Sequence, residues 1–145
     1  MITIIQRVSS ANVAVNSQII GTIGEGIMAL IAIEKQDNES HAKRLVEKIL
    51  NYRIFADADG RMNLSLRDIN GGLLLVPQFT LAANTAKGNR PSFASAATPE
   101  HGKHLFQYFI DRADQVYQNC QHGQFGADMQ VQLVNNGPVT FTLRV

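Results

Sequence analysis

Four consecutive stretches with the periodicity of strands, and no helical face among them, occupy the first third of the chain. They are residues 1–8, 11–15, 19–23 and 27–33. The first three alternate apolar with polar side chains, as half-buried strands do. The fourth is a continuous apolar run bounded by glycines, which favours a strand buried on both faces. Polar residues 16–18 predict a turn. The chain must therefore build a sheet before it builds a helix.

A helical period appears first between Asp37 and Tyr52. Apolar residues fall on one face of this segment. Asp37, Asn38 or Ser40 supplies a capping side chain at its start. Residues 54–55 are short and extended, and the apolar run 72–79 predicts another buried strand.

The second helix begins clearly at Thr98-Pro99-Glu100. This tripeptide offers a capping hydroxyl, a proline at the first helical position and an acid. Its apolar stripe extends to Tyr117, and Gly123 predicts its end. That boundary places Cys120 in the last turn, where the helix dipole disfavours a thiolate. Cys120 is therefore interpreted as an incidental thiol rather than a nucleophile.

The closing residues have strand periodicity on both sides of a turn signal. Val131 and Leu133 precede Asn135-Asn136-Gly137-Pro138, and alternating apolar residues follow it from Val139 to Val145. This arrangement predicts a hairpin. Together, the segments predict an α+β fold in a single domain over residues 1–145. An antiparallel, barrel-like β-sheet would carry two main α-helices packed against it.

Composition excludes several functional classes. The net charge of +1 gives no overall basic field, so a nucleic acid would have to bind through a local patch. A single cysteine excludes an internal disulfide and fits a reducing compartment. The sequence contains no signal-peptide pattern and no apolar run near 18 residues, so we expect a cytoplasmic protein without a membrane partner. His101 and His104 lack further ligands at metal-binding spacing, and we expect no metal and no cofactor.

Residues 81–97 have no period. Structureless segments of this length in compact domains are usually functional or disordered. Lys87 and Arg90 lie here beside Gly88 and Pro91, which suggests a contact with phosphate. A solvated loop without function is the alternative interpretation.

Ordinary enzyme signatures are nearly absent. There is no Gly-x-Ser-x-Gly elbow. The glycines at 21, 24 and 26 and the aspartates at 57 and 59 indicate turns rather than nucleotide or calcium loops. Three stretches remain: residues 77–81 at a strand end, the long segment 81–97, and residues 136–140.

These stretches together resemble the bacterial D-aminoacyl-tRNA deacylases, also called D-tyrosyl-tRNA deacylases, over essentially the whole chain. The first family signature is a run that begins with Ser-Gln and ends with Leu, matched here by Pro77-Gln78-Phe79-Thr80-Leu81. The second is Asn-x-Gly-Pro-x-Thr, intact from Asn135 to Thr140. One departure matters: Pro77 stands where the family usually has serine, and it lacks both a hydroxyl and a backbone N–H.

The resemblance implies how the protein distinguishes D-amino acids from L-amino acids. In this family the Gly-Pro peptide is cis, and the protein is a homodimer in which each Gly-Pro corner enters the partner's pocket. The carbonyls of Gly137 and Pro138 would then bind the α-ammonium of the substrate. A D side chain would project into free space, whereas an L side chain would collide with the corner. Glycine has no side chain to collide, so the partners would be tRNA carrying a D-amino acid or glycine.

The reaction implied by the resemblance is hydrolysis of the ester between a D-amino acid and the terminal adenosine of tRNA, as chiral proofreading in translation. Backbone N–H groups of Phe79 and Thr80 would stabilise the oxyanion, and Gln78 would support the pocket. By resemblance to the FGADM stretch, Phe125 and Met129 would pack near the adenosine. The attacking water would be activated with help from the tRNA's own 2′-hydroxyl.

Two rival hypotheses stay open. In the first, Pro77 leaves a non-catalytic tRNA-binding dimer of the same fold. In the second, the chain is a small-ester hydrolase with Thr80 or Ser92 as nucleophile.

Overall fold

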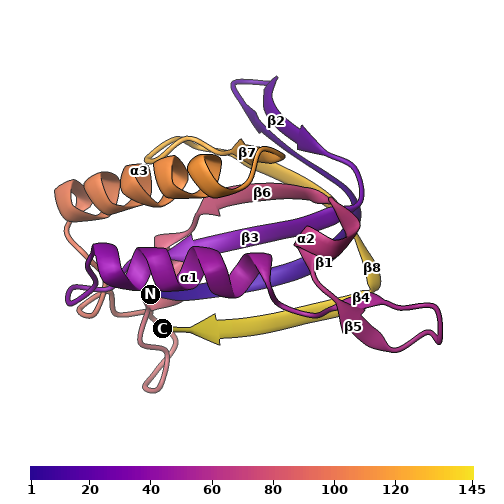
Figure 1. The fold of residues 1–145 in the computed structure, drawn as a ribbon. Coiled ribbons are helices and arrows are strands. Elements are labelled where there is room, and N and C mark those ends of the chain that lie inside the picture. The colour runs from indigo at the N-terminus through magenta and orange to yellow at the C-terminus, as the bar shows by residue number, and fades with distance from the viewer.

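The computed structural model describes residues 1–145, and it is built around a curved sheet with two helices on one face (Figure 1). Helices α1 (Glu39–Leu50) and α3 (Pro99–Val116) lie side by side on that face. The main strands are β1 (Ile2–Val15), β2 (Gln18–Ile23), β3 (Gly26–Ala32), β6 (Gly72–Pro77), β7 (Cys120–His122) and β8 (Gln130–Arg144). The smaller elements are β4 (Phe55–Ala56), β5 (Met62–Leu64), α2 (Leu66–Ile69) and the 3₁₀ turn η1 (Phe79–Ala82). No helix is long and apolar enough to span a membrane.

The sheet is mixed, so the prediction of an antiparallel sheet is only partly right. Its order is β2-β1-β3-β6-β7, with β8 paired to β1 as well. β1 is antiparallel to β2, β3 and β8, whereas β3, β6 and β7 are parallel. The parallel half follows from the chain order, because α1 separates β3 from β6 and α3 separates β6 from β7. Helical crossovers of this kind return the chain in the same direction.

The first two predicted strands are one strand with a bulge. β1 continues from Ile2 to Val15, and its pairing with β8 shifts register between Val8 and Ser10. The bulge adds a residue to the strand, so that the alternation of side chains between the two faces of the sheet is shifted beyond it. Ile5 faces the helices, while Val8 and Ala11 both lie in the core on the opposite face. The sequence pattern shows this change of phase as an interruption.

The predicted C-terminal hairpin is wrong. β8 is a single strand, and both of its halves pair with β1 in the same antiparallel direction. Gln6 pairs with Thr140 and Val8 with Asn135, so the residues between them protrude from the ladder. The Asn-Asn-Gly-Pro signal therefore marks a bulged corner, not a reversal. The chain does not turn back because β1 is long enough to pair with both halves.

The helix starts were predicted correctly, whereas the end of the second helix was not. Asn38 caps α1, with its Oδ1 accepting from the N–H groups of Ser40 and His41. Thr98 caps α3 by accepting from the N–H of His101. However, α3 ends at Val116, and Cys120 is the first residue of β7. Gly123 follows that strand and does not terminate the helix.

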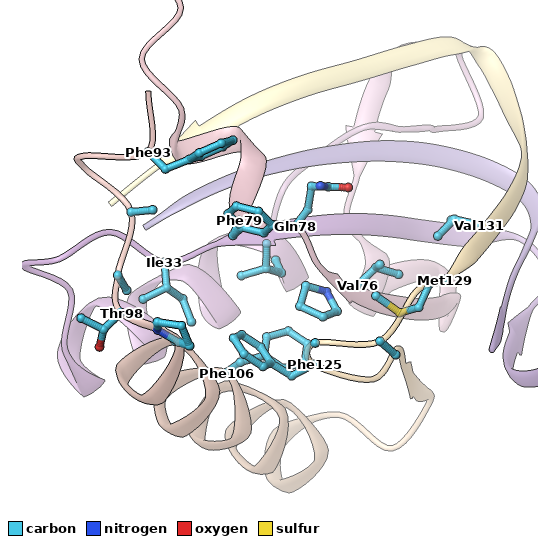
Figure 2. A pocket seen from close by; sticks show the side chains of 18 residues that line it. Ile33, Val76, Gln78, Phe79, Phe93, Thr98, Phe106, Phe125, Met129 and Val131 are labelled. Carbon is cyan, nitrogen blue, oxygen red and sulfur yellow. The ribbon is translucent and has the colours of Figure 1, made fainter. Parts of the chain in front are cut away.

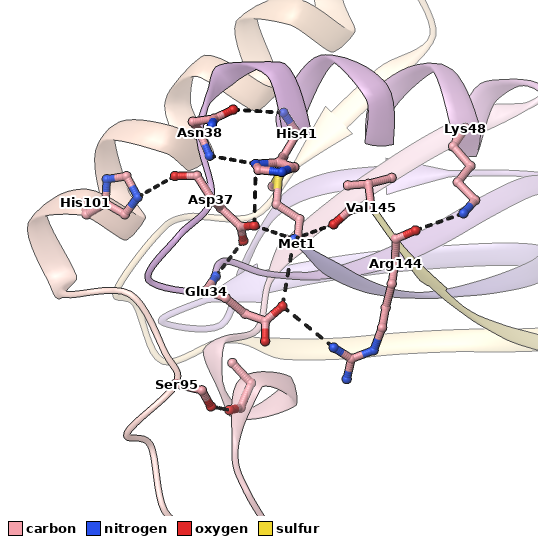
Figure 3. A network of polar contacts seen from close by, with 11 residues as sticks. Met1, Glu34, Asp37, Asn38, His41, Lys48, Ser95, His101, Arg144 and Val145 are labelled. Atoms are coloured by element: carbon pink, nitrogen blue, oxygen red, sulfur yellow. Dashed lines mark hydrogen bonds and ion pairs between the residues drawn. The ribbon is translucent and has the colours of Figure 1, made fainter.

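A buried carboxylate ties both helices to the start of β1 (Figure 3). Asp37 accepts hydrogen bonds from the Met1 ammonium at 2.6 Å and from the N–H of Glu34 at 2.7 Å. Its own carbonyl lies 3.0 Å from Nε2 of His101 on α3. Asp37 is only 8% exposed, so solvent screens these contacts little. The network fixes the end of β3 relative to the beginnings of α1 and α3.

The main core lies between the sheet and the helices, and one buried polar side chain in it lacks a hydrogen-bond partner. Thr3 is fully buried, and its hydroxyl has no hydrogen-bond partner.

We expect Thr3→Val to raise the free energy of unfolding by about 1 kcal/mol, because it removes the buried hydroxyl and keeps the shape. In thermal denaturation this corresponds to an increase in Tm of roughly 2–4 °C. Thr3→Ser, which keeps the hydroxyl and loses the methyl group, is the control and should lower Tm. An unchanged or lower Tm for Thr3→Val would contradict the assignment.

Candidate active site

A pocket opens at the carboxyl ends of the parallel strands, where ligands bind in sheets of this kind. Its volume is about 590 Å³. Ile31 and Ile33 line it at the end of β3, and Val76 to Phe79 line it at the end of β6. The segment between β7 and β8 and the beginning of α3 complete the walls (Figure 2). Of its 18 lining residues 12 are hydrophobic, and none has an acidic, basic or histidine side chain. The groups that this chain itself offers for catalysis in the pocket are therefore main-chain groups and neutral side chains.

The strand-end motif adopts a sharp turn. The N–H of Gln78 still donates to the carbonyl of Ile31 on β3, at 2.7 Å. Phe79 and Thr80 then open the 3₁₀ turn η1, in which the first N–H groups have no acceptor within the turn. Nε2 of Gln78 donates to Oγ1 of Thr80 at 2.5 Å. The motif thus presents two backbone donors beside the pocket, with the Gln78 side chain fixed across the turn.

Pro77 occupies a position where a backbone N–H is not needed. In the ladder, Gln78 bonds to β3, so the nitrogen of residue 77 faces the side of β7. On that side, β7 ends at His122, and the last hydrogen bond to β6 is donated by the N–H of Gly123 to the carbonyl of Leu75. A proline therefore ends the strand without breaking a hydrogen bond. It adds an apolar ring to the pocket wall in place of a hydroxyl.

Phe125 and Met129 both line the pocket. The Phe125 ring packs against Phe106 of α3, with ring centroids 6.2 Å apart. The Met129 sulfur accepts from the N–H of Gln124 at 3.4 Å, which folds the β7–β8 segment over the site. Both side chains are half-buried, so each has a surface available to a ligand.

The Gly137–Pro138 peptide is cis, and neighbouring side chains hold this corner from both sides. Arg7 of β1 donates from Nε to the carbonyl of Asn136 at 2.9 Å and from Nη1 to the carbonyl of Ile54 at 2.6 Å. Asn135 accepts from the N–H of Val139 and donates to the hydroxyl of Thr140, both at 2.8 Å. The corner is therefore braced rather than free to move.

Glycine is required at position 137. Its φ is +140°, and an added Cβ would lie 2.6 Å from Cγ2 of Val139. Both Gly137 and Pro138 are exposed, and neither lines the pocket of its own chain. Gly137 lies six residues beyond Val131, the last pocket residue on β8, which is up to about 20 Å of strand. One chain alone does not bring its corner and its pocket together.

Lys87 and Arg90 lie outside the pocket, on an exposed hairpin. Asn84 and Ser92 exchange backbone hydrogen bonds of 2.7 and 3.1 Å and close the hairpin. Neither cation forms an ion pair. The long segment is therefore anchored at its base by backbone hydrogen bonds, although residues 84–95 are all exposed.

Two residues that contribute to the pocket and the corner were not predicted from the sequence. Phe93 lines the pocket next to Phe79, and the only signal for it was an aromatic residue inside an otherwise polar loop. Arg7 gave no signal, because a single basic residue on an exposed strand position is ordinary. The two candidate nucleophiles, Thr80 and Ser92, gain no support: neither side chain lines the pocket, and the Thr80 hydroxyl contacts the Gln78 amide rather than a base. Burial raises the pKa of the Cys120 thiol to about 12, with the Asp114 carboxylate as a further cause, which agrees with its interpretation as an incidental thiol.

The bracing of the corner by Asn135 can be tested by substitution. Asn135→Ala leaves the partly buried N–H of Val139 without its acceptor, and we expect a loss of about 1–2 kcal/mol in the free energy of unfolding. Asn135→Asp keeps an acceptor and can receive the Thr140 hydroxyl, so it should retain most of the stability. Urea denaturation measures both variants. Equal stability of the alanine variant and the natural chain would refute the brace.

Known proteins share both the sequence and the fold. The family model described as D-Tyr-tRNA(Tyr) deacylase matches residues 4–144. A D-aminoacyl-tRNA deacylase of Pseudoalteromonas atlantica is 54% identical over 145 residues, covering all of both chains. The one from Pseudoalteromonas translucida is 56% identical over 98% of each chain.

Two solved structures have the same architecture. A protein titled c-Myc DNA Unwinding Element Binding Protein has a TM-score of 0.95 and 36% identity, over 100% of this chain and 99% of that one. A probable eukaryotic D-amino acid tRNA deacylase has a TM-score of 0.86 at 17% identity, covering 99% and 98%, and this likeness concerns the fold alone. The match of the family model over nearly the whole chain, with identities above 50%, establishes that this chain belongs to the D-Tyr-tRNA(Tyr) deacylase family.

Proposed function

We propose that this D-aminoacyl-tRNA deacylase selects and cleaves its substrate with main-chain groups rather than reactive side chains. The reaction is hydrolysis of the ester that joins a D-amino acid to tRNA, which releases the free amino acid and the tRNA. The observation that carries the proposal is the pocket itself, in which no lining side chain is acidic, basic or a histidine. An ester is already activated, so hydrolysis needs only a modest reduction of the barrier.

The backbone N–H groups of Phe79 and Thr80 are the proposed oxyanion donors. They open a 3₁₀ turn at the rim of the pocket, where the turn itself leaves such groups without acceptors. Donors that are already oriented stabilise developing negative charge without reorganisation. Gln78 fixes the turn through its hydrogen bond to Thr80. The attacking water would receive its activation from the 2′-hydroxyl of the substrate, since the pocket supplies no base.

The Gly137–Pro138 corner is the proposed chirality filter. Its carbonyls would accept hydrogen bonds from the α-ammonium of the substrate and thereby fix the amine. A D side chain then points away, whereas an L side chain meets the corner. Because glycine has nothing to collide, glycyl-tRNA should also be cleaved. The two-sided bracing by Arg7 and Asn135 supports this role, because a filter based on rejection must be rigid.

The filter requires a second copy of the chain. The corner lies outside the pocket of its own chain, so it would have to act in the pocket of a partner. β8 pairs only with β1 and leaves its other edge open along 15 residues. Val131, Val134 and Phe141 on this strand are 36–57% exposed. An open edge with apolar side chains is suited to self-association in a homodimer.

Phe125 and Met129 would contact the terminal adenosine, and Lys87 and Arg90 the tRNA backbone. The first two offer apolar surface inside the pocket. The two cations have no acidic partner, and residues 78–98 contain no aspartate or glutamate. A local basic segment of this kind attracts phosphates although the whole chain carries only +1.

Substrate handedness is the direct test of the function. We expect the protein to cleave D-tyrosyl-tRNA roughly 100-fold faster than L-tyrosyl-tRNA, and to cleave glycyl-tRNA, because only the L side chain meets the corner. The measurement is release of labelled amino acid from each substrate. Survival of both tyrosyl esters would favour the non-catalytic tRNA-binding dimer. Loss of both at similar rates would favour an unselective ester hydrolase and remove the filter.

A mixing experiment tests whether the corner acts across the dimer. Gln78→Leu impairs the pocket, and Gly137→Val impairs the corner because the added side chain collides with Val139. Each variant alone should be nearly inactive. After unfolding and refolding together, about one quarter of the natural activity should return, since half of the dimers are mixed and each contains one intact composite site. Each variant refolded alone is the control. No recovery, with mixed dimers demonstrated by mass, would place the corner in the site of its own chain.

A further inference from the structure

Two exposed phenylalanines lie together at the mouth of the pocket. Phe79 is 57% and Phe93 is 40% exposed, and their ring centroids are 5.0 Å apart (Figure 2). They come from different elements, since Phe79 begins η1 and Phe93 follows the hairpin closed by Asn84 and Ser92. An exposed pair of large aromatic side chains that also lines a ligand pocket marks a contact surface rather than core packing.

The base of the hairpin is fixed, so the pair is presented in a defined position. The Ser95 hydroxyl donates to the carbonyl of Ala82 at the end of η1, at 2.5 Å. The N–H of Lys35 donates to the carbonyl of Ser95 at 3.1 Å, and Glu34 and Ala96 form a further bridge. Phe93 is therefore held against η1 by contacts on both sides, although its ring is open to solvent.

The charges on the hairpin itself have one sign, since Lys87 and Arg90 lie at its tip. At its base, Lys35 lies next to Glu34, whose carboxylate is paired with the Met1 ammonium and with Arg144. Lys35, Lys87 and Arg90 form no ion pair, and no acidic residue occurs between Gln78 and Thr98. Aromatic faces beside unpaired cations are the combination with which proteins bind single-stranded nucleic acid. The alternative occupant of this surface is a second copy of the chain, which would need carboxylates to pair with these cations. The exposed strand β8, which we propose as the contact between copies, contains no Asp or Glu.

We propose that Phe79 and Phe93 form a stacking platform for the nucleotide that immediately precedes the terminal adenosine of the tRNA, with the hairpin cations beside its phosphate. The inference rests on the proposed function, in which the pocket holds the aminoacyl adenosine. The strand leaving the pocket passes its mouth, where this pair lies. Stacking on aromatic faces is tolerant of sequence, as is required of a protein that acts on the common single-stranded end of many tRNAs.

The platform is tested by comparing two substrates of different length. D-tyrosyl-adenosine contains only the terminal nucleoside, whereas D-tyrosyl-CCA adds the two preceding nucleotides. For the natural chain, kcat/KM should be higher with the trinucleotide. In Phe93→Leu, this preference for the longer substrate should fall about tenfold, mainly through KM, because a stacking face is lost. Phe93→Tyr keeps an aromatic face and should keep the preference.

The possible results distinguish a failure of the proposed function from a failure of the stacking platform. If the natural chain cleaves neither D ester, the proposed function fails before the platform is tested. If Phe93→Leu lowers kcat/KM for both substrates equally, Phe93 shapes the adenosine pocket and the platform is refuted. If the variant loses its dimeric state in size-exclusion chromatography, the aromatic pair belongs to the contact between copies and the platform is likewise refuted. An unchanged preference in the leucine variant also overturns it.

Discussion

The antiparallel pairing of β1 with β8 is the constraint on which the rest of the structure depends. These are the two longest strands, of 14 and 15 residues, and they pair over almost their whole lengths. Main-chain hydrogen bonds along such a ladder fix register, because a shift by one residue would move every buried side chain to the other face. Where the register is interrupted, the extra residues have to protrude, and the protrusion is the Gly137–Pro138 corner.

The corner and the pocket illustrate two ways of leaving backbone polar atoms available to a ligand. At the pocket, a strand ends in a 3₁₀ turn, so that N–H groups are left without partners inside the element. At the corner, a strand bulges, and Arg7 and Asn135 take up the surrounding polar groups so that the exposed peptide keeps one shape. Arg7 braces the corner, but no titratable side chain lines the pocket. Both devices depend on the surrounding packing, and the proposed mechanism therefore leaves few catalytic signatures in the sequence.

Local patterns were informative wherever the answer depended on neighbouring residues. Thr98 was predicted as a cap, and Asn38 was one of three candidates, because a capping side chain bonds to N–H groups two or three residues away. The buried strands β3 and β6 were recognised from their apolar runs. The errors arose where a distant partner decided. The change of phase at Ser9 indicated a break, and the Asn-Asn-Gly-Pro signal indicated a hairpin, because alternation cannot reveal a bulge opposite another strand.

Residue identity and short spacing were sufficient to indicate the family, the starts of the two main helices and the two motifs. Contacts between distant segments were needed to show that the sheet is mixed, that β8 is one strand and that Cys120 begins a strand. The tertiary structure also brings Phe93 beside Phe79, although the two residues are 14 positions apart in the chain. It brings Arg7 to the corner through its hydrogen bond to Asn136, which is 129 positions away. The physical reason is that strand partners and pocket walls are chosen by burial and backbone pairing between distant segments, which no local pattern contains.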